Sequence, residues 1–214
     1  MRITDKHVVL IGAGEMENEK LIITKDDYVI ALDGGLVFCD EHGIRPDRIV
    51  GDFDSLPADR QELLKKYPEE KIYRLPCEKD DTDTLTAIKL AIEEGFTSFS
   101  IYGGLGGRLS HTIANVQSLL YLKEHGLHGE LIGCNSRIFL VKDESISVPF
   151  RDNGYVSVFS YSQKAEGVTL KNLKYEITDA VLTNKFPIGV SNEFIGKPAE
   201  ITVKEGILLI IIES

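Results

Sequence analysis

Aspartates stand at three places in the chain where they could act together on one ligand. Asp33 precedes two glycines, Asp52 and Asp54 belong to the motif Gly-Asp-Phe-Asp-Ser, and Asp83 ends the run Lys-Asp-Asp-Thr-Asp. Asp52 and Asp54 are two residues apart, so on an extended segment both carboxylates would point the same way. Grouped carboxylates repel one another unless a cation lies between them. An oxygen-rich set of this kind suits Mg²⁺, which proteins hold with a few carboxylates and the phosphates of a substrate.

A second group of residues could bind phosphate. Residues 103–108 read Gly-Gly-Leu-Gly-Gly-Arg, so the backbone can approach a ligand closely there, and a helix beginning at Leu109 would favour an anion at its N-terminus. Arg108 offers a bidentate phosphate donor, and Lys79 offers a second positive charge. Acidic residues for a metal beside basic residues for phosphate are the arrangement of phosphoryl-type transfer.

Strands and helices alternate in the first two-thirds of the chain and would place these motifs. Apolar runs predict strands at residues 7–11, 28–32, 48–50, 71–75 and 98–102. Helical patterns occupy residues 55–67, with Ser55 as cap and Pro57 in the first turn, residues 84–94 and residues 109–125. Leu109, Ile113, Val116 and Leu120 should share one face of the last helix. This alternation predicts an open α/β sheet, largely parallel, whose ligands bind at the carboxyl ends of the strands.

The pattern of predicted elements changes after about Asp143. Short strand-like runs follow at residues 145–148, 155–159, 167–170, 180–182, 199–203 and 207–212, with Asn, Gly, Lys and Pro between them. No helix of more than two turns suggests itself. This pattern is typical of a small β-sandwich, so we expect an α/β domain over residues 1–143 and a β-sandwich domain over residues 144–214.

The composition limits the classes of protein to which the chain could belong. The net charge of −10 argues against a DNA- or RNA-binding surface, which would need a basic stripe. The three cysteines, Cys39, Cys77 and Cys134, are odd in number and form no Cys-x-x-Cys pair, which argues against a disulfide framework or zinc site and favours a reducing compartment. No signal peptide or membrane span is apparent, so we expect a cytoplasmic protein.

Simpler interpretations exist for each motif. Asp33-Gly34 and Asp54-Ser55 could be turns, and Thr82 or Asp83 could cap a helix. Gly12-Ala13-Gly14 follows a strand, with Asp33 about 20 residues further on, as a dinucleotide-binding unit would require. Glu17 occupies the place of the third glycine of that fingerprint, and further glutamates would repel a pyrophosphate. The metal interpretation is therefore preferred over the dinucleotide one.

The ordered motifs resemble those of the thiamine pyrophosphokinase family. Gly-Asp-Phe-Asp-Ser at 51–55, Asp-Thr-Asp at 81–83 and Gly-Arg-Leu-Ser-His at 107–111 occur in the order of that family, after an early Asp-Gly-Gly. Residues 189–194, Gly-Val-Ser-Asn-Glu-Phe, resemble its late Gly-x-Ser-Asn segment. The resemblance runs nearly end to end, and the order of the motifs is more specific than any one of them.

The resemblance implies transfer of pyrophosphate from ATP to thiamine, giving thiamine diphosphate and AMP. It implies a homodimer, with thiamine bound between the α/β domain of one protomer and the sandwich of the other. Asp33, Asp52, Asp54 and Asp83 would hold Mg²⁺, and Asp54, Asp83 and Arg108 would be catalytic. The ATP-binding residues would be Asp33, Gly34, Asp52, Lys79, Thr82, Gly104, Arg108 and His111. The thiamine-binding residues would be Ser191, Asn192 and Phe194.

Two departures from the family pattern leave alternatives open. Ser110 stands where the family has an aspartate before the histidine, so the site could bind metal or substrate differently. The chain has no tryptophan, so an aromatic contact to thiamine would fall to Phe194 or Tyr175, with Tyr175 favoured as a core residue. A pyrophosphokinase for another alcohol, such as a hydroxymethylpterin, and a non-catalytic nucleotide-sensing module are the alternative functions.

Overall fold

The computed structural model describes residues 6–16, 21–54, 56–78 and 80–214. The chain forms two compact units, Met1–Cys134 and Asn135–Ser214. The boundary between the two domains that we expect after residue 143 is not tested by this division and stays a prediction. None of the described helices combines the length and the apolar character needed to cross a membrane.

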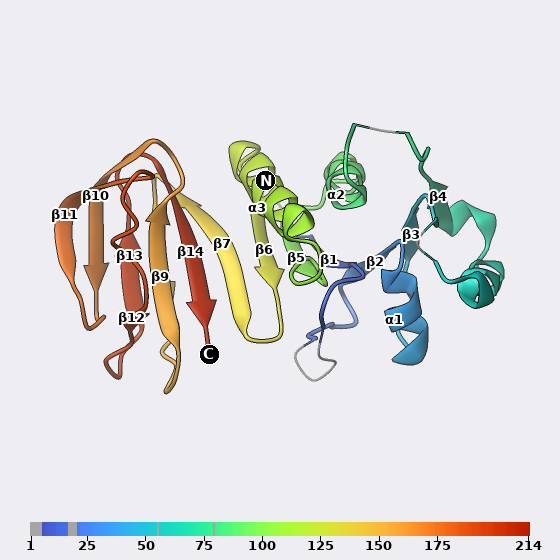
Figure 1. Ribbon diagram of the computed structural model, residues 1–214, viewed down its shortest axis with the longest axis horizontal. Helices are drawn as coiled ribbons and strands as arrows, with labels where there is room; N and C mark the ends of the chain where they lie inside the picture. Colours follow the sequence, from blue (N-terminus) through green and yellow to red (C-terminus); the bar gives the residue numbers. More distant parts are fainter. Residues whose placement is uncertain (1–5, 17–20, 55, 79) are drawn as a thin grey trace. The chain divides into compact units, whose positions relative to one another are not determined.

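The first unit contains six neighbouring strands that pair in parallel (Figure 1). Its strands, in spatial order, are β6 (His128–Ile132), β5 (Ser98–Tyr102), β1 (His7–Ile11), β2 (Tyr28–Leu32), β3 (Arg48–Gly51) and β4 (Ile72–Arg74). The last four residues of β1, β2 and β5 are all buried, as in parallel sheets that are covered on both faces. The five predicted strands are confirmed. The order reverses between β1 and β5, which makes the carboxyl ends of these two strands the topological switch point.

Helices cover both faces of this sheet. Figure 1 shows α2 (Asp83–Glu93) and α3 (Leu109–Glu124) on one face and α1 (Gly35–Glu41) on the other. The 3₁₀ helices η2 (Ala58–Lys66) and η3 (Glu69–Lys71) lie between β3 and β4 in the chain. The open, largely parallel α/β fold is thus confirmed for this unit.

Two of the helix predictions need correction. Residues 58–66 form a 3₁₀ helix with Pro57 at its N-cap position rather than an α-helix from Ser55, which lies outside the described residues. The apolar face expected for α3 is also not the face that this helix buries. Leu109 and Ile113 are 74% and 53% exposed, whereas Leu119 and Leu122 are buried.

The buried face of α3 follows from its contact with β6. A Cβ atom on Gly129 of β6 would lie 2.4 Å from Cδ1 of Leu122, so the glycine lets the helix pack closely there. The polar residues on this face are satisfied locally: Asn115 Nδ2 donates to the Gly104 carbonyl at 2.7 Å, and Ser118 Oγ donates to the Ala114 carbonyl at 3.0 Å. The apolar pattern of the sequence gives no sign of these hydrogen bonds, so it did not identify the buried face of α3.

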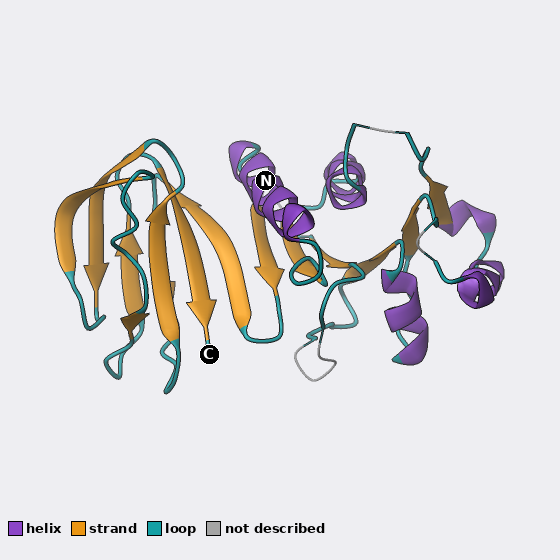
Figure 2. Ribbon diagram, viewed as in Figure 1, coloured by secondary structure: helices purple, strands orange, loops and turns teal. Residues whose placement is uncertain are grey.

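The second unit is a β-sandwich (Figure 2). The strands of its first layer follow the order β12 (Asn192–Glu193), β9 (Tyr155–Ser160), β14 (Ile207–Glu213) and β7 (Ser136–Lys142). The other layer has the order β11 (Ile177–Thr183), β10 (Lys164–Lys171), β13 (Ala199–Thr202) and β8 (Ser145–Val148). All pairings within these two sets are antiparallel. Side chains from both sheets share one core, including Val158, Leu170 and Ile210, which confirms the predicted sandwich.

Candidate active site

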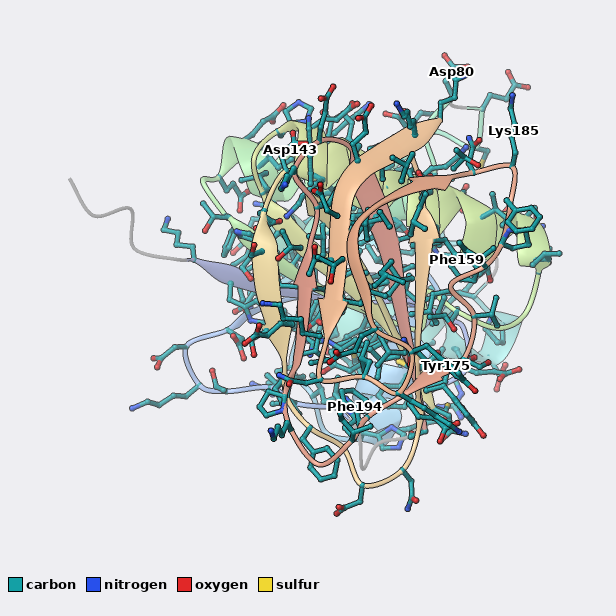
Figure 3. All side chains as sticks on the ribbon, turned by 90° about the vertical axis from the view of Figure 1, so that its left-hand side faces the viewer. Asp80, Asp143, Phe159, Tyr175, Lys185 and Phe194 are labelled. Atoms are coloured by element: carbon teal, nitrogen blue, oxygen red, sulfur yellow. The ribbon has the colours of Figure 1, made fainter. Side chains whose placement is uncertain are left out.

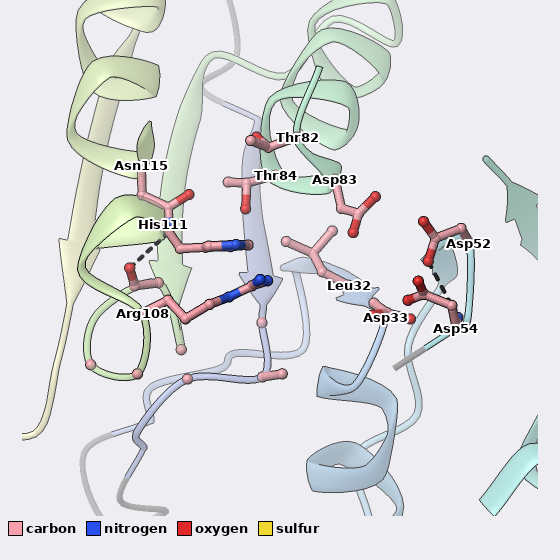
Figure 4. Close-up of a pocket in the computed structure, with 17 residues that line it drawn as sticks. Leu32, Asp33, Asp52, Asp54, Thr82, Asp83, Thr84, Arg108, His111 and Asn115 are labelled. Atoms are coloured by element: carbon pink, nitrogen blue, oxygen red, sulfur yellow. Dashed lines mark hydrogen bonds between the residues drawn. The ribbon is translucent and has the colours of Figure 1, made fainter. Parts of the chain in front are cut away.

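One pocket at the carboxyl ends of the strands gathers most of the residues singled out by the sequence. It measures about 480 Å³ and lies entirely within the α/β unit. Figure 4 shows acidic side chains along one side and Arg108 with His111 along the other. The lining residues are Gly12, Ala13, Gly14, Leu32, Asp33, Asp52, Asp54, Thr82, Asp83, Thr84, Gly103, Gly104, Gly106, Gly107, Arg108, His111 and Asn115. The convergence expected from strand-end placement is therefore present.

Three of the aspartates form a tight cluster. One carboxylate oxygen from each of Asp33, Asp52 and Asp54 lies within 4.8 Å of the other two. These oxygens form a donor set that fits a hard divalent cation such as Mg²⁺. Asp83 lies on the same side of the pocket, with its carboxylate toward Asp52 and Asp33 (Figure 4), and one side-chain oxygen of Asp83 is buried, as is one of Asp33.

The geometry that joins Asp52 to Asp54 is a turn rather than an extended segment. Phe53 between them has φ of 63°, in the left-handed region that costs a bulky residue about 1–2 kcal/mol. Its ring is buried in the core beneath the sheet edge, and the Asp54 backbone N–H donates to Asp52 Oδ1 at 3.3 Å. The carboxylates converge as expected, but because of this turn and the buried phenyl anchor, not because of strand alternation.

Asp33 owes its place to a sharp turn between β2 and α1. Its φ is 45°, and its backbone N–H donates to the Val50 carbonyl of β3 at 2.9 Å. A Cβ atom at Gly35 would lie 2.0 Å from the Ile11 carbonyl oxygen, so only glycine lets α1 begin this close to β1. Gly34 stands at the N-cap of α1 and is not among the described residues that line the pocket.

The Asp-Thr-Asp triplet divides its roles. Thr82 is the N-cap of α2, and its Oγ1 accepts from the Leu85 N–H at 3.2 Å, yet it also lines the pocket. Asp81 is paired with Lys89 at 2.5 Å, and the bond to Asp81 raises the pKa of Lys89. Asp83 is therefore the carboxylate of the triplet that lines the pocket. Lys79 lies outside the described residues.

The early glycines support the glycine-rich loop after β5. The Gly12 N–H donates to the Tyr102 carbonyl at 2.8 Å, and the Gly14 N–H donates to the Gly103 carbonyl at 2.9 Å. Residues 12–16 form no helix, so a dinucleotide-binding strand–turn–helix is absent from this part of the described chain. Asn115 of α3 holds the other side of the loop through Gly104. The sequence interpretation missed Asn115, because an asparagine inside a helix pattern gives no such signal.

Basic groups stand at the start of α3. Arg108 is the N-cap residue, its carbonyl accepts from the His111 N–H at 3.0 Å, and its side chain points into the pocket (Figure 4). His111 lines the same wall. Ser110, where the family has an aspartate, is exposed and is not among the described lining residues, so the departure lies outside the pocket wall.

The late Ser-Asn segment lies in the sandwich unit and has its own geometry. Asn192 is buried, its Oδ1 accepts from the Tyr175 N–H at 2.9 Å, and its Nδ2 donates to the Tyr175 carbonyl at 2.7 Å. Ser191 is exposed with φ of 55°, and its N–H donates to Ser157 Oγ at 3.0 Å. The side-chain amide of Asn192 thus fixes the backbone of Tyr175.

The two candidate aromatic residues lie in different surroundings. Tyr175 is 61% exposed, so its interpretation as a core residue was wrong. Phe194 packs against the core and makes an edge contact with Phe150. Figure 3 labels Tyr175 and Phe194 on the sandwich unit. The Lys174 ammonium lies 5.6 Å from the Tyr175 ring centre, and its bond to Glu193 raises the pKa of Lys174. Tyr175 borders an apolar recess of about 100 Å³, together with Leu170, Ile177, Leu182, Ile188, Gly189, Val190 and Asn192.

Comparison with protein families gives two matches along the chain. The model described as "Thiamin pyrophosphokinase, catalytic domain" matches residues 20–129, and the model described as "Thiamin pyrophosphokinase, vitamin B1 binding domain" matches residues 143–208. The first match contains the aspartate cluster, and the second contains the Ser-Asn segment.

Individual proteins agree with the family match. A curated thiamine pyrophosphokinase from Bacillus subtilis (strain 168) is 29% identical over 184 residues, which is 85% of each chain. A crystal structure of the Bacillus subtilis thiamine pyrophosphokinase matches with a TM-score of 0.87 and 27% identity over 98% of this chain and 99% of that one. The thiamin pyrophosphokinase from Geobacillus thermodenitrificans matches with a TM-score of 0.85 and 28% identity over 97% of each chain.

Proposed function

The chain belongs to the thiamin pyrophosphokinase family, and we propose that it transfers the pyrophosphoryl group of ATP to the hydroxyl group of thiamine, giving thiamine diphosphate and AMP. The observation that carries this proposal is the pocket in which the Asp33–Asp52–Asp54 cluster lies opposite Arg108 and the glycine-rich loop that precedes it. Such a pocket can hold a polyphosphate between a metal ion at the aspartates and the guanidinium group of Arg108. The choice of thiamine as the acceptor alcohol rests on the family match and the relatives.

We assign the ATP end to this pocket. Mg²⁺ held by Asp33, Asp52, Asp54 and Asp83 would neutralise charge on the phosphate oxygens. The phosphates would lie along Gly104 and the N-terminus of α3, where backbone N–H groups and the helix dipole favour an anion. His111, Thr82 and the segment containing Gly34 and Lys79 complete the proposed ATP-binding set.

Arg108 has the central catalytic role in this proposal. The thiamine hydroxyl oxygen attacks the β-phosphorus, the bond from that phosphorus to the bridging oxygen breaks, and AMP leaves with that oxygen. The guanidinium can donate two parallel hydrogen bonds to the transferred group as charge develops on it. The hydroxyl proton passes to Asp54, Asp83 or water, and a loose transition state needs little help from a base.

We place thiamine recognition at the Ser191–Phe194 segment of the sandwich. The exposed Tyr175 ring beside the apolar recess offers an aromatic face for a heterocycle, and a cationic ring would gain a cation–π contribution there. Asn192 would act by holding Tyr175 in place rather than through its own amide, and Ser191 remains free to approach the ligand from its turn. Phe194 would support this surface from the core side.

We also propose a homodimer in which the thiamine site is completed by a second protomer. Leu109 and Ile113 expose apolar surface on α3 directly beside the ATP pocket, as an interface residue would in an isolated chain. Light scattering should give the mass of a dimer, and Ile113→Glu should shift it to a monomer with lost activity. A monomeric wild-type chain with full activity would exclude this assembly.

The cytoplasm is the proposed location. The cysteines Cys39, Cys77 and Cys134 are all free thiols, which agrees with a reducing compartment. Burial raises the pKa of Cys39 to about 12, so that thiol is chemically inert at neutral pH.

The acceptor can be identified by comparing alcohols side by side. The purified chain with ATP and Mg²⁺ is supplied with thiamine or with a hydroxymethylpterin, and AMP release is followed by a coupled assay. Thiamine should give the larger kcat/KM by orders of magnitude. Asp54→Asn should lower turnover by about a hundredfold or more, while Asp59→Asn, an exposed aspartate outside the pocket, should leave it unchanged. A preference for the pterin, or ATP binding without turnover, would favour one of the alternatives instead.

A further inference from the structure

A second cavity of the α/β unit lies at the opposite ends of the strands from the candidate active site. It measures about 370 Å³ and is formed by the end of α1, the loop before β3 and the segment before β4. Its lining residues are Cys39, Asp40, Gly43, Ile44, Arg45, Pro46, Lys66, Tyr67, Pro68 and Lys71, and we name it the basic pocket. Among the described residues, none lines both this pocket and the aspartate pocket.

The charge in the basic pocket is positive although the whole chain carries −10. Lys66 pairs with Asp40 at 2.6 Å, and these two charges cancel. Lys71 donates to the Pro46 carbonyl at the long distance of 3.5 Å, which leaves most of its donor capacity unused. Within the described part of the chain, the Arg45 guanidinium enters no ion pair. Arg45 and Lys71 therefore supply two cationic groups that are not neutralised inside the cavity.

The other polar groups of the basic pocket do not oppose an anion. Cys39 keeps its proton, since burial raises its pKa to about 12. Burial, and then the neighbouring Cys39 and Asp40, raise the pKa of Tyr67 against the opposing charge of Arg45, so the phenol stays a neutral donor. The Cys39 carbonyl at the end of α1 accepts from the Ile44 N–H at 2.8 Å and is thus already satisfied.

We propose that the basic pocket binds a small phosphorylated molecule, with its phosphoryl dianion between Arg45 and Lys71. Two unneutralised cations match the charge of a phosphomonoester better than that of a single carboxylate. The fork of an arginine side chain also matches the geometry of phosphate oxygens. Ile44, Tyr67 and Pro68 provide an apolar wall for the organic part, and the volume falls within the range of roughly 300–1,000 Å³ typical of ligand sites.

The test uses phenyl phosphate, which combines a ring with a phosphoryl dianion. The full chain is titrated in EDTA and followed by ¹H–¹⁵N NMR with assigned amides. Saturable shifts are expected at Gly43, Arg45 and Lys71. Arg45→Gln and Lys71→Gln should each weaken binding by about tenfold or more, since a charge-assisted hydrogen bond is lost. Lys65→Gln, a neighbouring exposed lysine outside the pocket, should bind like the wild type.

The outcomes separate cleanly. Linear, non-saturating shifts, shifts confined to residues 103–111, or unchanged affinity in both pocket variants would overturn the proposal. Two independent variants, each checked for an unchanged melting temperature, keep the result interpretable if one of them is misfolded. Because the titration contains neither ATP nor thiamine, its result is independent of the proposed enzyme activity.

Discussion

Replacing Gly14 by alanine should damage the ATP pocket in a way that the structure makes quantitative. A Cβ atom at Gly14 would lie 2.4 Å from the Leu105 carbonyl oxygen and 2.5 Å from that of Gly103. Both distances fall about 1 Å short of ordinary contact, and both partners are backbone atoms that cannot rotate away. The glycine-rich loop must therefore move by a similar amount, and the bond from the Gly14 N–H to Gly103 must lengthen from 2.9 Å.

A displacement of this size has a calculable kinetic effect. Misplacing a binding element by about 1 Å can cost about a hundredfold in rate, or about 2.7 kcal/mol of transition-state stabilisation. We therefore expect Gly14→Ala to lower kcat/KM for ATP by about a hundredfold. Overpacking should also cost about 1–3 kcal/mol of folding stability, which leaves most domains folded at 25 °C. AMP release at varied ATP and saturating thiamine measures the first effect, and urea denaturation measures the second.

Gly126→Ala is the matched control. Gly126 has φ of 72° just after α3, with no atom within 4 Å of its hypothetical Cβ. Alanine there should cost about 1–2 kcal/mol of stability through backbone strain alone and leave kcat/KM for ATP within about twofold. Wild-type kinetics in Gly14→Ala would refute the argument that the two glycine segments together shape the phosphate site. An equal loss of activity in both variants would attribute it to stability instead.

Three further predictions follow from the site and the sheet. Asp54→Asn should lower kcat by about a hundredfold or more by removing one charge from the proposed metal site, with partial recovery at high Mg²⁺ in a metal titration. Asn115→Ala should cost about 1–3 kcal/mol in urea denaturation, because the buried Gly104 carbonyl loses its bond at 2.7 Å, and an unchanged midpoint would contradict this. Burial raises the pKa of Asp27, but hydrogen bonds from His7 and Thr24 outweigh it and leave that pKa below its usual 3.8. Asp27 therefore contributes stability above about pH 4, and this contribution is lost as the pH falls through the pKa of the folded state. The difference in unfolding free energy between wild type and Asp27→Asn should shrink from pH 6 to pH 3. A difference that grew over this range would refute the assignment.

Much of the fold was predictable because the relevant signals are local. The runs that form β1 and β2 are almost continuously apolar, the run that forms β5 alternates two serines with apolar residues, and all three end at glycine or aspartate, which marks both a buried strand and its limit. The inward face of α3 was not predictable in this way. It depends on Gly129 of β6, distant in sequence, and on the bond from Asn115 to Gly104, neither of which alters hydrophobic periodicity.

The candidate site was likewise predictable only in part from the sequence. Residue type and strand-end position were sufficient to group Asp33, Asp52, Asp54 and Asp83. The left-handed backbone of Phe53 could not be inferred, because a buried aromatic residue normally avoids that conformation and is held in it here by the core. The exposure of Tyr175 was likewise hidden, because the Asn192 side chain that holds its backbone lies 17 residues further along the sequence.

The central claim is that the aspartate pocket transfers a pyrophosphoryl group rather than a single phosphoryl group. The most direct test is ³¹P NMR of a reaction containing the chain, ATP, Mg²⁺ and thiamine, with both products quantified. The account predicts AMP and thiamine diphosphate in equal amounts, with both formed about a hundredfold more slowly by Asp54→Asn. Formation of ADP with thiamine monophosphate, or of AMP without thiamine diphosphate, would contradict it.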